Sequence, residues 1–299
     1  MQPRPRIIAV VGPTAMGKSD LGVLLAKHFG GEVVSADSRQ VYRGLDIGSG
    51  KIAGKEMQGV EHHLLDIRDP KRTYSVAHFQ RDARKVVRGI LKRGKIPIVV
   101  GGTGFYLDAL FTDMTLPKVK PDVALRKQLE MLKTNELITK LIAIDQRRAD
   151  KIDTNNRVRL IRAIEIATHH GPVAPITTSS PYDVLYIGLR TSDNELLRER
   201  IMKRLAKRLR QGMLAEFKQL NQQGLSWKRM EMLGLEYRFG ARLMQKQITK
   251  KEFIAQLSSE IYKYAKRQMT WFKRNKNIFW FDIKNIAEIE TFVDRWISP

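Results

Sequence analysis

The feature that most restricts the fold of this chain is a glycine-rich segment between a short apolar run and a helical pattern. Residues Gly12 to Ser19 fit the pattern G-x-x-x-x-G-K-[ST], and the β-branched run Ile7–Val11 precedes them. Leucines then recur at helical spacing from Leu21 onward. In such a strand–loop–helix unit the loop backbone curls so that its N–H groups point inward, which predicts a cradle for phosphate groups.

Each part of this loop has an expected task in the cradle. Lys18 supplies a positive charge to the terminal phosphates, and the Ser19 hydroxyl is a candidate metal ligand for Mg²⁺. The helix N-terminus adds its partial positive charge. The motif predicts a bound di- or triphosphate, as in ATP-binding proteins, and leaves open whether a phosphoryl group is transferred. The predicted diphosphate-binding residues of the loop are Gly12, Pro13, Thr14, Ala15, Met16, Gly17, Lys18 and Ser19.

Further apolar runs predict the rest of a sheet. Between these runs apolar residues recur at helical spacing, for example from Val76 to Leu91. Strands that alternate with helices indicate crossover units and a parallel sheet covered on both faces. We therefore predict an α/β fold, a P-loop NTPase-like parallel sheet with helices on both faces. The predicted strands are Ile7–Val11, Glu32–Ala36, Ile96–Val100, Val184–Leu189 and Ile278–Phe281.

The alternation is interrupted in the middle of the chain. Pro117 and Pro121 break the pattern, and from about residue 122 to 170 the pattern is helical without a clear strand. Residues 171–181 are rich in Pro, Thr and Ser, and we expect them to form a loop. This segment therefore predicts an all-α insertion in the α/β fold.

These boundaries divide the chain into two predicted domains. The α/β core domain comprises residues 1–117 plus 183–299, and the helical insertion comprises residues 118–182. In the core, Leu197 to Leu209 carry an apolar residue every four positions, so one face of a basic helix is expected to pack. Helices are predicted in the second half of the core at about 195–211, 250–274 and 286–297.

The composition restricts the partners. The chain has 54 Lys and Arg against 31 Asp and Glu, a formal net charge of +23, which indicates a polyanionic partner. There is no cysteine, which excludes disulfides and Cys-based metal or redox chemistry. No apolar run approaches the roughly 18 residues of a membrane span, and the first is too short for a signal-peptide core. We therefore expect a cytoplasmic protein that uses no membrane.

Asp37 stands at the carboxyl end of the second predicted strand. In an open parallel sheet this edge faces the ligand crevice, so Asp37 is expected to face the phosphate loop. A carboxylate there can hold a metal through water or act as a general base. A third possibility is that the carboxylate merely caps a turn. The position of Asp37 alone does not decide among these roles.

The segment that Asp37 opens is more distinctive than the phosphate loop. Together with that loop, it resembles the tRNA dimethylallyltransferases, also called tRNA isopentenyltransferases or the IPP transferase family. The resemblance runs in order from residue 6 to about residue 282. The segments that carry it are Ser35–Gly48, Gly59–Ile67, Gly101–Leu107, Asn155–Glu165 and Tyr264–Phe272.

The resemblance implies transfer of the dimethylallyl group from dimethylallyl diphosphate to the exocyclic N6 amine of an adenine. That adenine lies 3′ of the anticodon in tRNAs that read codons beginning with U, and the products are N6-isopentenyladenosine and diphosphate. In the family, the Asp that matches Asp37 is the base, and the Thr that matches Thr103 orients the amine. Arg204 matches an arginine that reaches the diphosphate. The implied cofactor is Mg²⁺, and we expect a monomer that binds the anticodon stem-loop.

The chemistry fits these residues, because an adenine amine is a poor nucleophile that needs a positioned base. A base in an RNA loop must be splayed out before an enzyme reaches it. The residues that match family positions in contact with the tRNA are Asp37, Ser38, Arg39, Gln40, Thr103, Arg126, Val158, Arg159, Leu160, Ile161 and Arg162.

Structural roles compete with these assignments. Thr103 lies in a glycine-rich turn before a helical pattern, where its hydroxyl is also suited to cap a helix. Arg204 is one of many cations on its helix and could lie on the surface. His62 and His63 lack a third ligand at metal-site spacing, so we favour a structural role for them. The aromatic residues near the C-terminus are expected mostly to pack, with the cations between them partly on phosphate.

The chain departs from the family pattern at two places. The common T-A-K-P segment is replaced by Ser49-Gly50-Lys51-Ile52, and the usual G-Y pair is replaced by Gly234-Leu235-Glu236-Tyr237. A C-terminal zinc finger is excluded because there is no cysteine, so the chain resembles the bacterial type.

Three other functions remain as alternatives. One is a related isopentenyltransferase that acts on free adenine nucleotides, which would need neither the insertion nor such excess charge. The second is a P-loop kinase, which would turn over ATP. The third is a non-catalytic RNA-binding module, which would not need Asp37 and Thr103 beside a phosphate cradle.

Overall fold

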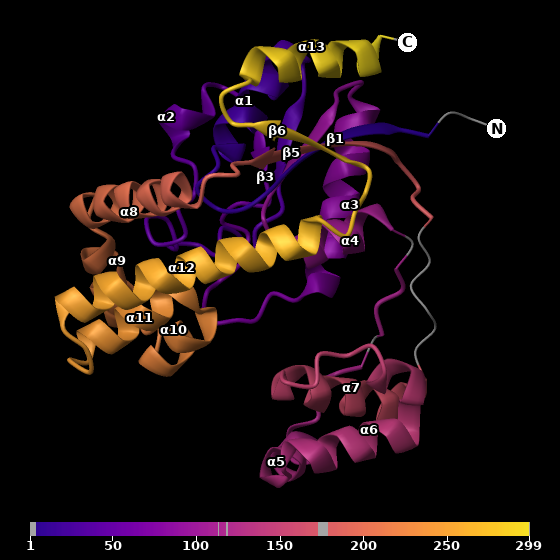
Figure 1. Cartoon of the computed structure of the whole chain (residues 1–299), viewed down its shortest axis with the longest axis vertical. Helices are drawn as coiled ribbons and strands as arrows, with labels where there is room; N and C mark the ends of the chain where they lie inside the picture. Colours follow the sequence, from indigo (N-terminus) through magenta and orange to yellow (C-terminus); the bar gives the residue numbers. More distant parts are fainter. Residues whose placement is uncertain (1–3, 113, 118, 173–178, 299) are drawn as a thin grey trace. The chain divides into compact units, whose positions relative to one another are not determined.

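The computed structural model describes residues 4–112, 114–117, 119–172 and 179–298. The chain divides into two compact units (Figure 1). One unit combines Met1–Phe111 with Ser180–Pro299, and the other is Thr112–Ser179. The second unit begins and ends a few residues earlier than the predicted insertion at 118–182.

The first unit contains a six-stranded, all-parallel sheet in the order β3-β2-β4-β1-β5-β6. The five predicted strands are confirmed, and no end differs by more than one residue. β3 was not predicted, because a run of two residues has no hydrophobic pattern. The strands are β1 (Arg6–Val11), β2 (Glu32–Ser35), β3 (His62–His63), β4 (Pro97–Val100), β5 (Asp183–Arg190) and β6 (Ile278–Asp282).

The centre of the sheet is buried on both faces. In β1 every residue from Ile7 to Val11 is fully buried, and all residues of β2 and β4 are buried as well. β1 lies between β4 and β5, with Ile8 opposite both Ile98 and Leu185. This burial explains why these strands are nearly continuous apolar runs and not alternating ones.

Helices cover both faces of the sheet. α1 (Lys18–His28) leads from β1 across to β2, and α3 (Val76–Lys92) lies on the path back from β3 to β4. Right-handed crossovers in opposite directions place these two helices on opposite faces. The closing helix α13 (Ile286–Ile297) lies beside α1, where His28 contacts Glu290 at 3.4 Å. The prediction of a parallel sheet with helices on both faces is therefore confirmed.

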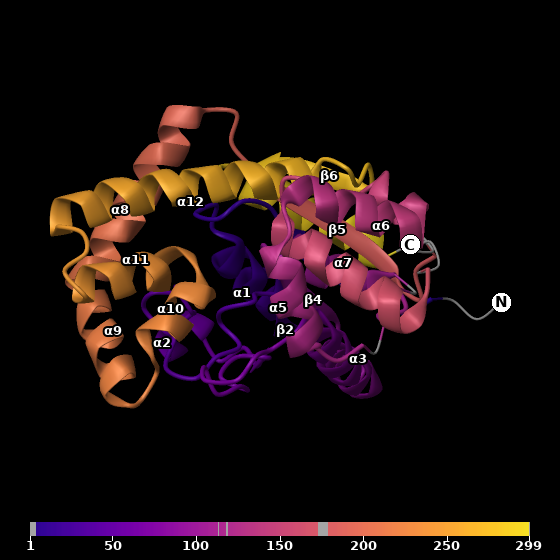
Figure 2. The same ribbon diagram turned by 90° about the horizontal axis from the view of Figure 1, so that it is seen from below.

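A cluster of helices follows β5 (Figure 2). On α8, Leu197, Ile201 and Leu205 are buried, as their spacing predicted. Three short helices between α8 and α12 were not predicted from the sequence. The helices are α8 (Asn194–Arg210), α9 (Met213–Gln222), α10 (Trp227–Leu233), α11 (Leu235–Met244) and α12 (Lys250–Phe272); two others, α2 (Gly54–Met57) and α4 (Gly104–Phe111), precede them in the chain.

In the second unit, the described residues form helices and no strand. These helices are α5 (Val123–Met131), α6 (Thr134–Ala149) and α7 (Arg157–His170). The Asp122 and Asn156 side chains accept backbone hydrogen bonds at the starts of α5 and α7, which fixes where these helices begin. Much of the predicted loop at 171–181 lies outside the described residues. Across the parts of the chain that are described, no helix has the length and apolarity of a membrane span.

Candidate active site

The strand order brings three loops together at the carboxyl edge of the sheet. The glycine-rich loop follows β1, Asp37 follows β2, and the turn at 101–103 follows β4. Because β4 lies between β1 and β2, its turn stands between the other two loops. A cavity of about 990 Å³ opens at this edge, lined by residues of all three loops and of α8, α11 and α12. This is where open parallel sheets bind ligands.

The phosphate loop has the backbone that its glycines require. Gly12 has φ +131°, and a Cβ there would lie 2.3 Å from the Leu189 carbonyl oxygen. Gly17 has φ +77° and begins α1 from the left-handed region, which L side chains rarely adopt. Of the eight predicted loop residues, Thr14 to Ser19 line the cavity. Gly12 and Pro13 lie behind them, at the end of β1.

Lys18 is held inside the loop. Its Nζ donates to the Pro13 carbonyl oxygen at 2.7 Å. Burial, together with the nearby Arg204 guanidinium, lowers the pKa of Lys18 to about 7, although the Asp37 carboxylate acts in the opposite direction. An anion bound in the cradle would restore the charged form of this lysine.

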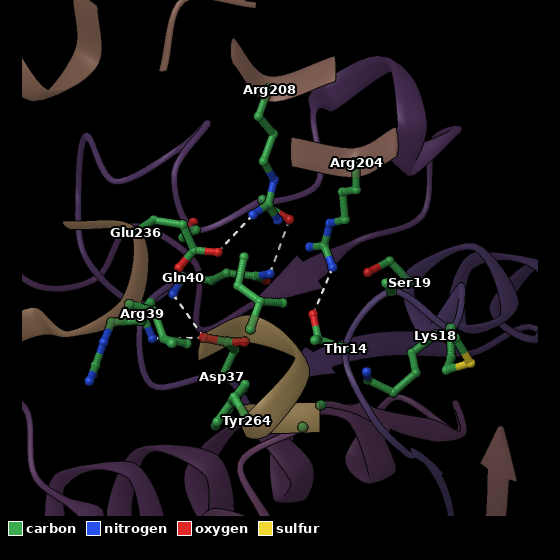
Figure 3. A pocket seen from close by; sticks show the side chains of 18 of the residues that line it. Thr14, Lys18, Ser19, Asp37, Arg39, Gln40, Arg204, Arg208, Glu236 and Tyr264 are labelled. Carbon is green, nitrogen blue, oxygen red and sulfur yellow. Dashed lines mark hydrogen bonds and ion pairs between the residues drawn. The ribbon is translucent and has the colours of Figure 1, made fainter. Parts of the chain in front are cut away.

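Arg204 reaches the same loop from α8 (Figure 3). Its Nη1 donates to the Thr14 Oγ1 at 2.8 Å, and Arg200 donates to the Ala15 carbonyl oxygen at 2.8 Å. Burial and the neighbouring Arg208 lower the pKa of Arg204 to about 10. Arg204 is therefore a cavity residue and not a surface cation, and its contact with a diphosphate stays a prediction.

The Asp37 carboxylate has two distinct oxygens. Oδ1 accepts hydrogen bonds from the backbone N–H groups of Arg39 at 2.7 Å and Gln40 at 3.3 Å. Oδ2 has no hydrogen-bond partner among the residues that the structure describes, and the side chain lines the cavity. Asp37 thus caps its own turn with one oxygen and leaves the other available to a ligand.

Thr103 is joined directly to the Asp37 turn. Its Oγ1 accepts a hydrogen bond from the Ser38 N–H at 3.3 Å, and its own N–H donates to the Ala36 carbonyl oxygen at 3.4 Å. The Tyr264 side chain of α12 lies close to Thr103. Burial raises the pKa of Tyr264 to about 12, so its hydroxyl is neutral near pH 7. The two predicted catalytic residues therefore belong to one hydrogen-bonded cluster.

The loop at 46–50 is fastened by residues that the sequence analysis missed. The Glu216 carboxylate accepts hydrogen bonds from the N–H groups of Asp46 at 3.0 Å, Ile47 at 2.6 Å and Gly48 at 3.1 Å. The Tyr237 hydroxyl donates to the same carboxylate at 2.9 Å. Glu216 lies about 170 residues from this loop in the sequence, and no local pattern identifies it.

The loop in turn holds the residues beside Asp37. Gln40 donates from Nε2 to the Gly50 carbonyl oxygen at 3.2 Å, and Arg39 donates from Nε to the Leu233 carbonyl oxygen. A Cβ on Gly50 would lie 1.7 Å from Nη2 of Arg208, so this glycine makes room for the arginine. The two departures from the family pattern therefore border the same cavity.

In the helical unit, two of the predicted tRNA-binding arginines share a carboxylate. Arg126 forms a two-point ion pair with Glu165, at 2.9 and 2.8 Å, and Arg162 pairs with the same side chain. Glu165 is fully buried. Both arginines have about a third of their side-chain surface exposed, which leaves them accessible to a polyanion.

The predicted tRNA-binding segment of α7 has a buried and an exposed side. The side chains of Leu160 and Ile161 are 0% and 8% exposed and pack in the core of the helical unit. Val158 is 78% exposed and Arg159 is also exposed. Contact of the segment Val158–Arg162 with tRNA stays a prediction, and its exposed side chains are Val158 and Arg159.

The remaining sequence candidates have structural partners. His63 hydrogen-bonds the buried Glu32 at 2.7 Å, and Glu32 also pairs with Arg93 and Lys95. Near the C-terminus, Phe272 is buried. Two aromatic rings of α12 carry arginine guanidinium groups over their faces. The Arg198 guanidinium lies 3.8 Å from the centroid of the Tyr262 ring, and the Arg274 guanidinium lies 3.8 Å from the centroid of the Trp271 ring.

Comparisons with known proteins identify the family of this chain. The model of the IPP transferase family matches residues 40–275. A tRNA dimethylallyltransferase 2 of Treponema denticola is 44% identical over 273 residues, which cover 89% of this chain and 91% of that protein.

Solved structures give the same result. The crystal structure of a tRNA isopentenylpyrophosphate transferase from Bacillus halodurans is 38% identical, with a TM-score of 0.74 over 97% of this chain and 96% of that chain. A eukaryotic dimethylallyltransferase acting on tRNA has a TM-score of 0.79 at 26% identity, over 98% of this chain and 77% of that chain. The chain therefore belongs to the IPP transferase family.

Proposed function

We propose that this protein transfers the dimethylallyl group of dimethylallyl diphosphate to the exocyclic N6 amine of the adenine 3′ of the anticodon in tRNA. Relatives across most of the chain are tRNA dimethylallyltransferases. The observation that carries the proposal is a cavity lined by both the phosphate cradle and Asp37, with Thr103 hydrogen-bonded to the Asp37 turn next to it. A cradle alone would fit a kinase, whereas Asp37 and Thr103 add a base and a hydroxyl for an acceptor amine.

The donor half of the reaction takes place at the cradle. As the bond between the dimethylallyl carbon and the diphosphate oxygen breaks, negative charge develops on the leaving diphosphate. Lys18, Arg204 and the N-terminus of α1 are placed to stabilise that charge. No phosphoryl group moves, so the P-loop here binds a leaving group.

The acceptor half takes place at the Asp37 turn. The new bond forms between the adenine N6 and the dimethylallyl carbon, and N6 must lose a proton. Oδ2 of Asp37 can accept it, because Oδ1 is already engaged by the turn. The Thr103 hydroxyl is held beside the Asp37 turn by the Ser38 N–H, where it can orient the amine.

The residues at the cradle also fit Mg²⁺. The Ser19 hydroxyl is exposed, and the carboxylates of Asp20 and Asp37 line the same cavity, which supplies the hard oxygen ligands that this ion prefers. When bound, Mg²⁺ would neutralise part of the charge of the diphosphate. Ser19 is the proposed protein ligand.

The proposed tRNA contacts come from both units. Ser38, Arg39 and Gln40 border the cavity, and Arg126, Val158, Arg159 and Arg162 belong to the helical unit. We propose that a monomer binds the anticodon stem-loop of one tRNA in the cytoplasm.

One labelling experiment tests the proposal. The protein is incubated with Mg²⁺ and labelled dimethylallyl diphosphate, with either unmodified tRNA or AMP as acceptor. We expect label in tRNA and none in AMP. Label in AMP alone would show the free-nucleotide activity, and transfer of a labelled γ-phosphate from ATP would show a kinase. Binding of tRNA without transfer would leave only an RNA-binding role.

A further inference from the structure

One face of α12 follows the turn that carries Thr103. Tyr264, Gln268 and Trp271 are four and three residues apart, so they lie along one side of the helix. Each contacts a different part of the turn. Tyr264 lies close to the Thr103 side chain, and a Cβ on Gly104 would lie 2.1 Å from Cδ1 of Trp271.

The middle residue of this face, Gln268, joins two loops. Its Oε1 accepts a hydrogen bond from the Thr14 N–H at 2.8 Å, and its Nε2 donates to the Gly102 carbonyl oxygen at 2.8 Å. The side chain is 6% exposed, so neither bond is readily replaced by water. A Cβ on Gly102 would lie 2.2 Å from Nε2 of Gln268, so the Gln268 amide approaches the backbone of the turn closely.

These bonds form a continuous connection between the two halves of the site. Arg204 donates to the Thr14 side chain, the Thr14 N–H donates to Gln268, and Gln268 donates to Gly102, the residue before Thr103. Arg204, at one end of this connection, faces the diphosphate cradle. Gly102, at the other end, belongs to the turn that carries Thr103.

We propose that Gln268 is a positioning residue that fixes the separation between the diphosphate cradle and Thr103. This role rests on the proposed function, because it sets the distance from the dimethylallyl carbon to the adenine amine. Gln268 lines the cavity, but protein partners occupy both polar atoms of its amide, so the proposed role is to act through those partners. A displacement of about 1 Å between reacting groups costs on the order of 10²-fold in rate.

The substitution Gln268→Met tests the proposal, because methionine has similar length and removes both hydrogen bonds. We expect the single-turnover rate with both substrates saturating to fall by about 10²-fold. Binding of inorganic pyrophosphate and of tRNA, measured by calorimetry and filter binding, should change little. The matched control is Gln256→Met, an exposed glutamine on the same helix, which should leave the rate unchanged.

A double-mutant cycle separates positioning from general stability. If Gln268 acts through the Thr103 turn, the rate losses of Gln268→Met and Thr103→Val will not add. If Gln268 serves only stability, the variant will have a lower unfolding temperature, a normal rate in its folded fraction and additive effects. That result, or a normal rate in a stable variant, would overturn the proposal.

Two further measurements keep the test decisive. If Gln268→Met does not fold, Gln268→Asn keeps the amide but is one methylene too short for both partners, and the same loss of rate is expected. Failure of the proposed function is distinguishable, because the unaltered protein would then transfer no label to tRNA. A normal rate for Gln268→Asn, with the unaltered protein active, would also contradict the positioning role.

Discussion

Arg208 and Glu236 form an ion pair of 2.9 Å in the wall of the cavity, with side chains only 7% and 13% exposed. Arg208 also donates to the Gly48 carbonyl oxygen at 3.2 Å and lies one helical turn after Arg204. The two guanidinium groups repel each other, and Glu236 offsets that repulsion at Arg204. One carboxylate therefore balances two arginines beside the phosphate cradle.

Glu236→Gln should destabilise the protein, because it leaves the Arg208 charge buried without a counter-charge. Removing one partner of a buried pair costs about 3 kcal/mol, which urea unfolding would measure as a lower midpoint. The control is Glu260→Gln, whose pair with Lys263 lies on the surface and should contribute less than about 1 kcal/mol. If the two substitutions lower the free energy of unfolding equally, the buried Arg208–Glu236 pair contributes no more to stability than the surface pair.

Pyrophosphate binding should weaken as the pH rises above about 7. Lys18 has a pKa of about 7 in the ligand-free site, and a bound anion raises that pKa, so binding takes up a proton at higher pH. Affinity should be greatest below pH 7 and fall by up to about tenfold per pH unit above it. Calorimetry in buffers of different ionisation enthalpy would count the protons.

The control for this prediction is Lys18→Arg, because arginine keeps its charge at every relevant pH. The change in protonation of pyrophosphate itself contributes equally to both proteins, so the difference between them isolates Lys18. Identical proton uptake in the two proteins would show that Lys18 is already charged in the free site.

Glu165→Gln should destabilise the helical unit. Burial acts to raise the pKa of Glu165, but hydrogen bonds from Arg126 and Arg162 outweigh it and lower the pKa to about 2. The folded state therefore gains stability above the ordinary pKa of a glutamate, and loses it as the pH falls toward 2. We expect a loss of about 1–3 kcal/mol near pH 7, measured by thermal unfolding, that shrinks in acid.

The matched control in that unit is Glu130→Gln, because Glu130 is exposed on α5. It should change the unfolding temperature little at any pH. A loss for Glu165→Gln that stays constant down to pH 2 would contradict the ion pair as its cause.

The central sheet and the cradle were predictable because their signals are local. A β-branched run such as Ile7–Val11 and a glycine that must adopt a left-handed backbone are each visible within a few residues. The same holds for Leu197, Ile201 and Leu205, whose spacing marks the buried face of α8. A local physical requirement leaves a local pattern in the sequence.

The residues that assemble the site were not predictable in this way. Gln268 and Thr14 are 254 positions apart, and Glu216 and Gly48 are 168 apart. A buried glutamine or glutamate looks like any exposed one in the sequence, and only the folded chain supplies its partners. Leu160 and Ile161 show a related limit, since a resemblance to family positions does not distinguish a buried side chain from an exposed one.

Asp37→Asn should separate the two roles of Asp37. Asparagine keeps an oxygen that can accept the N–H groups of Arg39 and Gln40, but its amide cannot take a proton from the adenine amine. If Asp37 is the general base, turnover will fall by about 10²–10⁴-fold in both Asp37→Asn and Asp37→Ala, with tRNA binding retained. If it only caps the turn, Asp37→Asn will stay active and Asp37→Ala alone will fail. Asp69→Asn is the control, because Oδ1 of Asp69 caps an exposed turn at Lys71 in the same way and lies outside the cavity lining.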